Sequence, residues 1–215
     1  FSFMSVSNFL FSTFSLPAYF LEDMSWLERI IPPRKPTITR TSRAENSENS
    51  LSGGSTYTQT DDNTADGAIL SKDDLTVNGS GALDVTAAYK HGIVSKNDLV
   101  ITGGEITVSA VEHCMTGKDC IKILDGTFHL TAQGKGMKSE NTEESEKGNI
   151  YVAGGTFVID TEDDALHTGG SIVLDGGSFT VDAGDDAFHA DLYMVVNDGA
   201  IAVNACYEGL ECRRV

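Results

Sequence analysis

A short segment recurs along the C-terminal part of the chain at a nearly constant interval. Each copy begins with a polar residue, followed by a small residue and a large apolar one, as in KGM at 135–137 and DAL at 164–166. The small residues, separated by 22, 22, 29, 22 and 22 positions, are Gly92, Cys114, Gly136, Ala165, Ala187 and Gly209. The single long step contains the polar run NTEESEKG at 141–148, which indicates an inserted surface loop. Self-similarity at a fixed period is typical of repeat proteins that stack one unit on the next.

Within each unit, apolar residues alternate with polar ones in short segments separated by turns. Leu99 and Ile101 form one alternating pair, and Phe128 and Leu130 form another that follows a glycine-containing turn. A period of two predicts strands with one buried face. The strands of one unit cannot enclose a core alone, whereas stacked units pair their strands and superimpose equivalent apolar residues. The sequence therefore predicts an all-β fold: a right-handed parallel β-helix (β-solenoid) with three short strands per 22-residue coil.

The chain divides into three parts by composition. Residues 1–36 begin with an apolar, aromatic stretch with interspersed serine, but they lack the basic start and cleavage site of a signal peptide. Residues 37–64 are rich in Ser, Thr, Asn and Glu, which is typical of a flexible linker. Residues 65–215 carry the repeats, and we expect this solenoid to be truncated at its C-terminus because no capping segment follows the last copy. Membrane association is expected only through an N-terminal anchor, and the sequence leaves the oligomeric state open.

Acidic side chains are concentrated in the repeat region. The chain has 32 Asp and Glu against 15 Lys and Arg, a formal net charge of −17, and residues 1–60 contribute none of the excess. A surface of this sign repels phosphate backbones, so nucleic acid is not expected as a partner. Such a surface suits multivalent cations, although acidity alone also serves solubility.

Acidic pairs precede the small residue in two successive units. The pairs are Asp163-Asp164 and Asp185-Asp186, and Glu208 holds the matching position in the next unit. Stacking in register would bring these carboxylates about one strand spacing apart, ~4.8 Å, where they repel one another. A cation lying between the coils would relieve that repulsion.

Calcium fits such a corner, because it accepts six to eight oxygen ligands at about 2.3–2.6 Å and could take them from two coils. The alternative interpretation is a solvated acidic edge whose Asp side chains cap turns. The calcium ligands predicted from the sequence are Asp163, Asp164, Asp185, Asp186, Asp191 and Glu208.

The repeated segments resemble those of a known family. KHGIVSKNDLVITGG, DDALHTGGSIVLDGGSFTV and DDAFHAD are similar to the carbohydrate-binding parallel β-helix family, first recognised in a clostridial cellulose- and pectin-binding surface protein. The fold of that family is similar to that of polysaccharide lyases. The resemblance implies an extracellular or cell-surface location, calcium sites at the acidic corner, and binding of pectin-, polygalacturonate- or cellulose-like polysaccharide.

Three functions are open at this level. A polysaccharide lyase acting on uronates would need a base beside the calcium, yet Lys96, Lys118 and Lys138 lie on one side of the coils and no basic residue is expected beside the acidic column. A structural adhesin or stalk module would need only the solenoid. The resemblance to the carbohydrate-binding family favours a third function over both, and we expect non-catalytic, calcium-dependent binding of extracellular polysaccharide.

Overall fold

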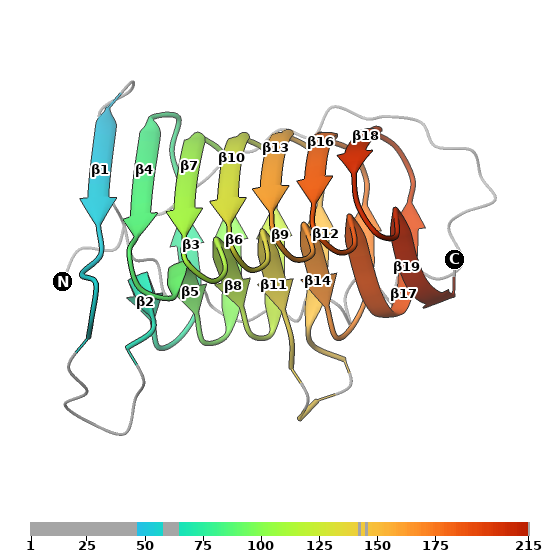
Figure 1. Cartoon of the computed structure of the whole chain (residues 1–215), viewed down its shortest axis with the longest axis horizontal. Coiled ribbons are helices and arrows are strands. Elements are labelled where there is room, and N and C mark those ends of the chain that lie inside the picture. Colours follow the sequence, from blue (N-terminus) through green and yellow to red (C-terminus); the bar gives the residue numbers. More distant parts are fainter. Residues whose placement is uncertain (1–46, 58–64, 142, 145, 215) are drawn as a thin grey trace, which may run out of the picture. The chain divides into compact units, whose positions relative to one another are not determined.

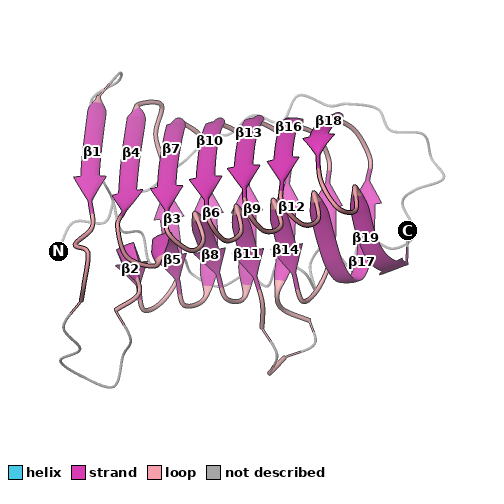
Figure 2. Cartoon of the chain, in the orientation of Figure 1, coloured by secondary structure: helices cyan, strands magenta, loops and turns pink. Residues whose placement is uncertain are grey.

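The computed structural model describes residues 47–57, 65–141, 143–144 and 146–214. These residues form strands and turns without any helix, and the strands wind into a parallel β-solenoid with three faces (Figures 1 and 2). Each complete coil contributes one strand to each face before the chain passes to the next coil. The predicted all-β parallel β-helix is therefore confirmed.

The strands of the three faces, here named A, B and C, are as follows. Face A contains β1 (Glu48–Ser52), β4 (Ala82–Ala87), β7 (Glu105–Ala110), β10 (Thr127–Ala132), β13 (Thr156–Thr161), β16 (Ser178–Ala183) and β18 (Ala200–Ala205). Face B contains β2 (Gly67–Ser71), β5 (His91–Ser95), β8 (Met115–Gly117), β11 (Met137–Ser139), β14 (Leu166–Thr168), the first part of β17 (Phe188–Val196) and β19 (Leu210–Arg214). Face C contains β3 (Leu75–Val77), β6 (Asp98–Ile101), β9 (Cys120–Ile123), β12 (Asn149–Val152), β15 (Ile172–Leu174) and the second part of β17.

The register between coils follows the sequence repeat. On face B, β11 pairs with β14 so that Met137 lies beside Leu166 and Ser139 beside Thr168. The insertion at 141–148 lies between β11 and β12, and it leaves the pairing on either side intact. The coils therefore stack equivalent positions over one another even across the inserted loop.

Equivalent apolar side chains form ladders inside the solenoid. The rings of Phe128 and Phe157 stack at a centroid distance of 4.7 Å, and those of Phe157 and Phe179 stack at 4.4 Å. These are the spacings of neighbouring strands, so each ring lies directly over its counterpart. A completely buried aliphatic ladder on face C consists of Leu99, Ile121, Ile150 and Ile172.

Strand β1 corrects the interpretation of residues 37–64 as a flexible linker. Glu48–Ser52 pairs in parallel with Ala82–Ala87 and adds a strand to face A. All of its residues are exposed, so backbone hydrogen bonds hold the strand in place without an alternating apolar pattern. Residues 37–46 and 58–64 lie outside the described residues.

The apolar segment 1–36, to which the sequence assigns no definite role, also lies outside the described residues. Within the described part of the chain, no helix has the length and apolar character needed to span a membrane.

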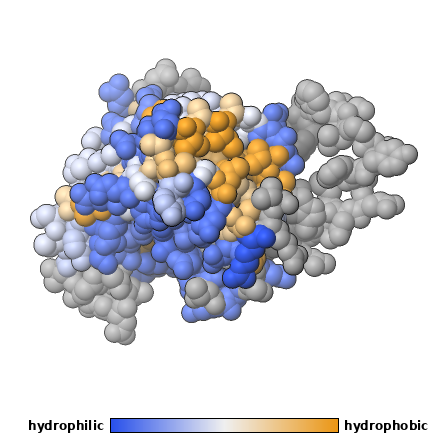
Figure 3. All heavy atoms as spheres, turned by 45° about the vertical axis from the view of Figure 1, so that its right-hand side comes forward, coloured by the Kyte–Doolittle hydropathy of each residue, from blue (hydrophilic) through white to orange (hydrophobic). Residues whose placement is uncertain are grey.

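The last coil leaves part of its apolar side uncovered. Figure 3 shows an apolar area on the side that carries the C-terminal coils, surrounded by hydrophilic surface. Leu210 lies over Phe188 in the ladder, yet it is 50% exposed, whereas Phe188 is fully buried. The terminal strands β18 and β19 have a neighbouring strand on one side only, which explains this exposure.

Replacing the central ring of the phenylalanine ladder should be strongly destabilising. We expect Phe157→Ala to lower the free energy of unfolding by about 3–5 kcal/mol, because the cavity forms between two stacked rings that cannot close it. Val158→Ala, one residue along on the outer surface and 41% exposed, should change it by less than about 0.5 kcal/mol. Equilibrium urea unfolding of both variants measures the difference, and equal effects would contradict the assigned inward direction of Phe157.

Candidate functional site

At the corner where the coils enter face B, side chains of several coils cap the backbone of the next coil. His91 Nδ1 accepts a hydrogen bond from the amide of His113 at 3.3 Å, and His113 Nδ1 accepts one from the amide of Lys135 at 3.0 Å. Asp164 Oδ1 accepts the amide of Asp186 in the same way at 3.0 Å. Histidine and aspartate thus perform one capping role in successive coils. The alternative interpretation of the acidic edge, in which Asp side chains act as caps, therefore accounts for one oxygen of Asp164 and one of Asp186.

The second oxygen of each capping Asp faces a histidine on face B. Asp164 Oδ2 lies 2.8 Å from His167 Nδ1, and Asp186 Oδ2 lies 3.0 Å from His189 Nδ1. The two imidazole rings stack one coil apart at 4.8 Å. Burial opposes ionisation of Asp164, but hydrogen bonds from His167 and Lys135 outweigh it and hold the pKa of Asp164 well below its usual value.

Carboxylates from neighbouring coils converge at this corner. One oxygen from each of Asp163, Asp164 and Asp185 lies within 4.8 Å of the others, and the same holds for Asp185, Asp186 and Glu208. A calcium ion with bonds of about 2.4 Å can bridge oxygens up to about that far apart. The structure thus brings together five of the six residues predicted as calcium ligands, in two groups that each span two coils.

Asp191 and Glu211 lie to either side of His189 rather than in these groups. Asp191 Oδ1 is 3.4 Å from His189 Nε2, whereas Glu211 Oε2 is 2.8 Å from Nδ1, the nitrogen that also faces Asp186. Sequence analysis missed Glu211. Glu211 lies beside His189 where β17 pairs with β19, and the repeat spacing could have predicted this neighbour.

Lys135 contradicts the expectation that no basic residue lies beside the acidic column. Its Nζ is 2.8 Å from Asp163 Oδ1 and 2.6 Å from Asp164 Oδ2, and its side chain is only 13% exposed. Lys135 holds the same repeat position as Asp164, one coil earlier, since the following residue Gly136 donates its amide to the Asp164 carbonyl. A lysine at that position reaches along the solenoid axis to the next coil. The first carboxylate group is therefore already compensated by an ammonium ion.

The second carboxylate group has no lysine or arginine partner among the described residues. Lost hydration and the adjacent Asp186 carboxylate raise the pKa of Glu208. Burial opposes ionisation of Asp186, but the hydrogen bond from His189 keeps its pKa below the usual value. The negative charge of Asp185, Asp186 and Glu208 is thus concentrated, and His189 beside Asp186 offsets it only in part, which is a condition that favours cation binding.

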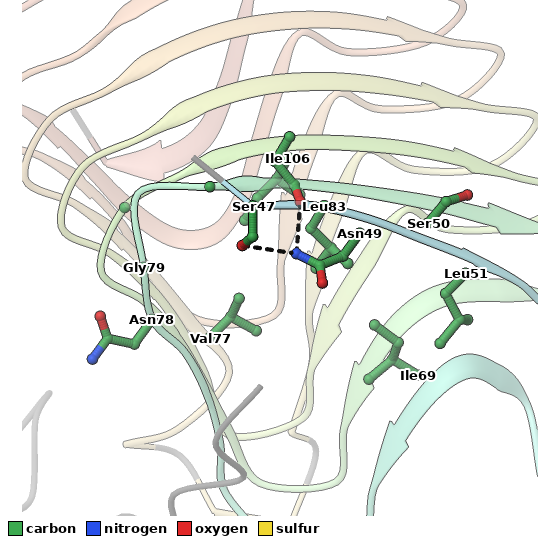
Figure 4. Close-up of a pocket in the computed structure, with 13 residues that line it drawn as sticks. Ser47, Asn49, Ser50, Leu51, Ile69, Val77, Asn78, Gly79, Leu83 and Ile106 are labelled. Carbon is green, nitrogen blue, oxygen red and sulfur yellow. Dashed lines mark hydrogen bonds between the residues drawn. The ribbon is translucent and has the colours of Figure 1, made fainter. Parts of the chain in front are cut away.

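Two hollows lie elsewhere on the solenoid. One, of about 240 Å³, opens beneath β1 at the first coil, and Figure 4 shows Leu51, Ile69, Val77 and Leu83 around it. Among the described residues that line it none is charged, and several belong to the first coil of the apolar core. The other, of about 280 Å³, is a polar groove on face B beside Thr116, in the coils that precede the acidic corner.

Fold and site together define a parallel β-solenoid whose repeated surface, rather than one deep cleft, offers positions to a ligand. Its ligand-capable groups are carried by successive coils on one face and one corner. The family described as "Carbohydrate-binding domain-containing protein" matches residues 36–214, and the chain belongs to this family. The resemblance drawn from the repeats is thereby confirmed.

Two relatives agree with this assignment. A "Carbohydrate-binding domain-containing protein" of Acetivibrio thermocellus is 35% identical over 125 residues, which cover 57% of this chain and 44% of that protein. The structure of a polysaccharide lyase-like protein from C. thermocellum, determined as a gadolinium derivative, is similar with a TM-score of 0.55 and 34% identity. That match covers 77% of this chain and 61% of the other. The chain thus spans less than two-thirds of the length of either relative.

Acid should destabilise the solenoid partly through Asp164. Because its folded-state pKa lies below the usual 3.8, its contribution is complete above about pH 4 and is lost as the pH falls through that lower value. We expect Asp164→Asn to lower the free energy of unfolding by about 2 kcal/mol at pH 6, since an amide cannot replace the carboxylate facing Lys135 and His167. This difference in the free energy of unfolding should become smaller towards pH 2, where the carboxylate of the wild type begins to take up a proton.

Denaturant unfolding between pH 2 and pH 7 measures this dependence. Asp160→Asn removes the same charge from an exposed position on face A and serves as the matched control. A loss for Asp164→Asn that did not vary with pH would contradict the assignment of an ionised, hydrogen-bonded carboxylate.

Proposed function

We propose that this protein is a non-catalytic, calcium-dependent polysaccharide-binding module of the extracellular space or cell surface. The observation that carries the calcium dependence is the group formed by Asp185, Asp186 and Glu208. Its oxygens lie within 4.8 Å of one another on two adjacent coils, with no lysine or arginine partner among the described residues. Carboxylate oxygens are the ligands that calcium prefers, and main-chain carbonyls or water would complete its shell.

The distribution of lysine favours this group over its neighbour. Lys135 already holds Asp163 and Asp164, so a calcium ion there would have to displace a buried ammonium group. No such displacement is needed one coil further along. Asp191 is not needed for this site, because its carboxylate contacts the far nitrogen of His189.

The comparisons support the polysaccharide, and the geometry of the acidic corner supports the cation. Membership of a carbohydrate-binding family supports the polysaccharide as partner. For the cation, the support is the group of three carboxylates from two adjacent coils. The extracellular location follows from the proposed partner, since such polymers occur outside cells.

A lyase is the second candidate, because the solved neighbour is called lyase-like. Elimination from a uronate needs a base that is unprotonated near neutral pH, as well as a Lewis acid. Lys135 is the basic residue in contact with the acidic corner, and its hydrogen bonds to Asp163 and Asp164 raise its pKa despite burial. It therefore holds its proton, and it serves as a structural cation and not as a base. This favours binding without cleavage.

Calcium should stabilise the folded protein. At a free concentration 100 times its dissociation constant, we expect about 2.7 kcal/mol of added stability, seen as a higher midpoint of thermal unfolding in calcium than in EDTA. Asp185→Asn with Asp186→Asn should abolish the difference between the two conditions and weaken retention on polygalacturonate. The effect of calcium should also weaken in acid, because the raised pKa of Glu208 makes this ligand take up a proton at a higher pH than an ordinary glutamate does.

Because Asp186 also caps the next coil, the calcium-dependent shift is the quantity compared, not the absolute midpoint. The control variant, Asp84→Asn with Asp160→Asn, removes two charges from the exposed surface of face A and should keep the full shift. Equal midpoints of the wild type in calcium and EDTA would refute the calcium site. Unsaturated sugar formed from polygalacturonate by the wild type, seen by ultraviolet absorbance, would identify a lyase instead.

A further inference from the structure

The polar groove on face B lies in coils that the acidic corner does not occupy. Its volume is about 280 Å³, and its lining includes Asp66, His113, Lys96, Lys118 and Lys138. Burial lowers the pKa of His113 to about 3, so this ring is neutral at physiological pH. The groove thus has three ammonium groups in a chain whose net charge is −17.

The lysines of the groove follow the register of the coils. Lys96 and Lys118 each come directly after a strand of face B, and their amides donate to Ser71 and Ser95 of the preceding coil. The same repeat position is held by Lys72 one coil earlier and by Glu140 one coil later. Positive charge therefore runs along this edge for three coils before its sign changes.

Each lysine of the groove has a carboxylate partner. Lys96 pairs with Asp66 at 2.7 Å, Lys118 with Glu143 at 2.9 Å and Lys138 with Glu140 at 2.8 Å. Asp66 is largely buried, whereas the side chains of Lys118 and Glu143 are 42% and 74% exposed. An ion pair as exposed as Lys118–Glu143 contributes little to stability, between about 0 and 1 kcal/mol. A carboxylate of a ligand can therefore take the place of Glu143 at Lys118 at low cost.

Two polar atoms of the groove lack a hydrogen-bond partner. Asp66 Oδ1 and Thr116 Oγ1 are both buried and unsatisfied, and Asp66 as a whole is only 9% exposed. Its other oxygen, Oδ2, accepts the Lys96 ammonium. Buried polar atoms almost always have partners, so these two atoms have unused hydrogen-bonding capacity at the floor of the groove.

The neutral histidine adds a directed donor. Because His113 Nδ1 accepts the amide of Lys135, its ring proton lies on Nε2. The groove thus combines ammonium groups for a carboxylate with a neutral donor and unsatisfied oxygens for hydroxyls. This is the donor and acceptor set of a sugar acid.

The inserted loop borders the same groove. Asn141 Nδ2 donates to Asp119 Oδ1 at 2.6 Å, and Lys147 Nζ lies 2.9 Å from Asp119 Oδ2. Asp119 is 6% exposed, so both ends of the loop are tied to a buried carboxylate. Glu143 of this loop contacts Lys118, which places the loop beside the lysine edge.

We propose that the face B groove binds the carboxylate-bearing sugar units of an acidic polysaccharide, through Lys96, Lys118 and Lys138. This deepens the proposed function, on which it rests, by locating the contacts with uronate carboxylates away from the calcium corner. The carboxylates of a polyuronate recur at every sugar unit, as the lysines recur at every coil about 4.8 Å apart. An extended polymer can therefore meet several lysines at once.

The test compares polygalacturonate with its methyl-esterified form, in which the carboxylates are neutral, at one fixed calcium concentration. We expect Lys96→Gln with Lys118→Gln to lower affinity for polygalacturonate about tenfold and to leave the ester nearly unchanged. The affinity of this double variant for polygalacturonate should also depend less on salt than that of the wild type, because fewer charges are neutralised on binding. The matched control is Lys90→Gln with Lys122→Gln, which removes two positive charges that lie outside the groove lining.

The outcomes separate this inference from the proposed function. Retention of neither polymer by the wild type would refute polysaccharide binding itself. Normal retention of polygalacturonate by Lys96→Gln with Lys118→Gln would refute only the role of the groove. Equal losses in the groove variant and in the control would attribute the effect to net charge and overturn the inference. If the groove variant lost the same affinity for polygalacturonate and for its ester, the groove would not recognise carboxylates, and the inference would be overturned.

Discussion

The parallel hydrogen-bond ladder between coils is the constraint on which the rest of this structure depends. It fixes the rise at one strand spacing, about 4.8 Å, and it places each residue over its counterpart one repeat away. For Phe128, Phe157 and Phe179 this superposition is favourable, and the rings stack at 4.7 and 4.4 Å. For carboxylates it is unfavourable, because like charges are forced together. One backbone pattern thus generates both the core and the charged corner.

The corner shows how the chain meets this constraint differently along its length. In several coils the first residue of the repeat supplies an acceptor for the next amide, and neutral His91 and His113 do so without adding charge. Lys135 supplies no acceptor, and the amide of Asp164 is instead capped by Asp163 Oδ1. The ammonium group of Lys135 offsets Asp163 and Asp164. Beyond Lys135 the column has no lysine or arginine partner among the described residues, so position along the solenoid sets the charge.

The same periodicity made the fold and most of the corner predictable from the sequence. Alternation predicts the strands, and the repeat predicts that Asp164 and Asp186 lie over one another, as the hydrogen bond from the Asp186 amide to Asp164 Oδ1 confirms. Strand β1 was missed because its residues are all exposed and it pairs by backbone alone. Lys135 and Glu211 were missed for another reason. Their contacts depend on how far a long side chain reaches along the axis or across the strand, which periodicity does not specify.

The inserted loop indicates how a solenoid can vary its binding surface while its coils stay fixed. Lengthening a loop costs little chain entropy when the strands on both sides are already paired. Here the loop ends are held at Asp119 by Asn141 and Lys147, and the register of β11 and β12 is unaffected. The loop lies where the lysine edge changes to Glu140. In a rigid stack such a boundary is the place where a few added residues alter charge and shape without disturbing the core.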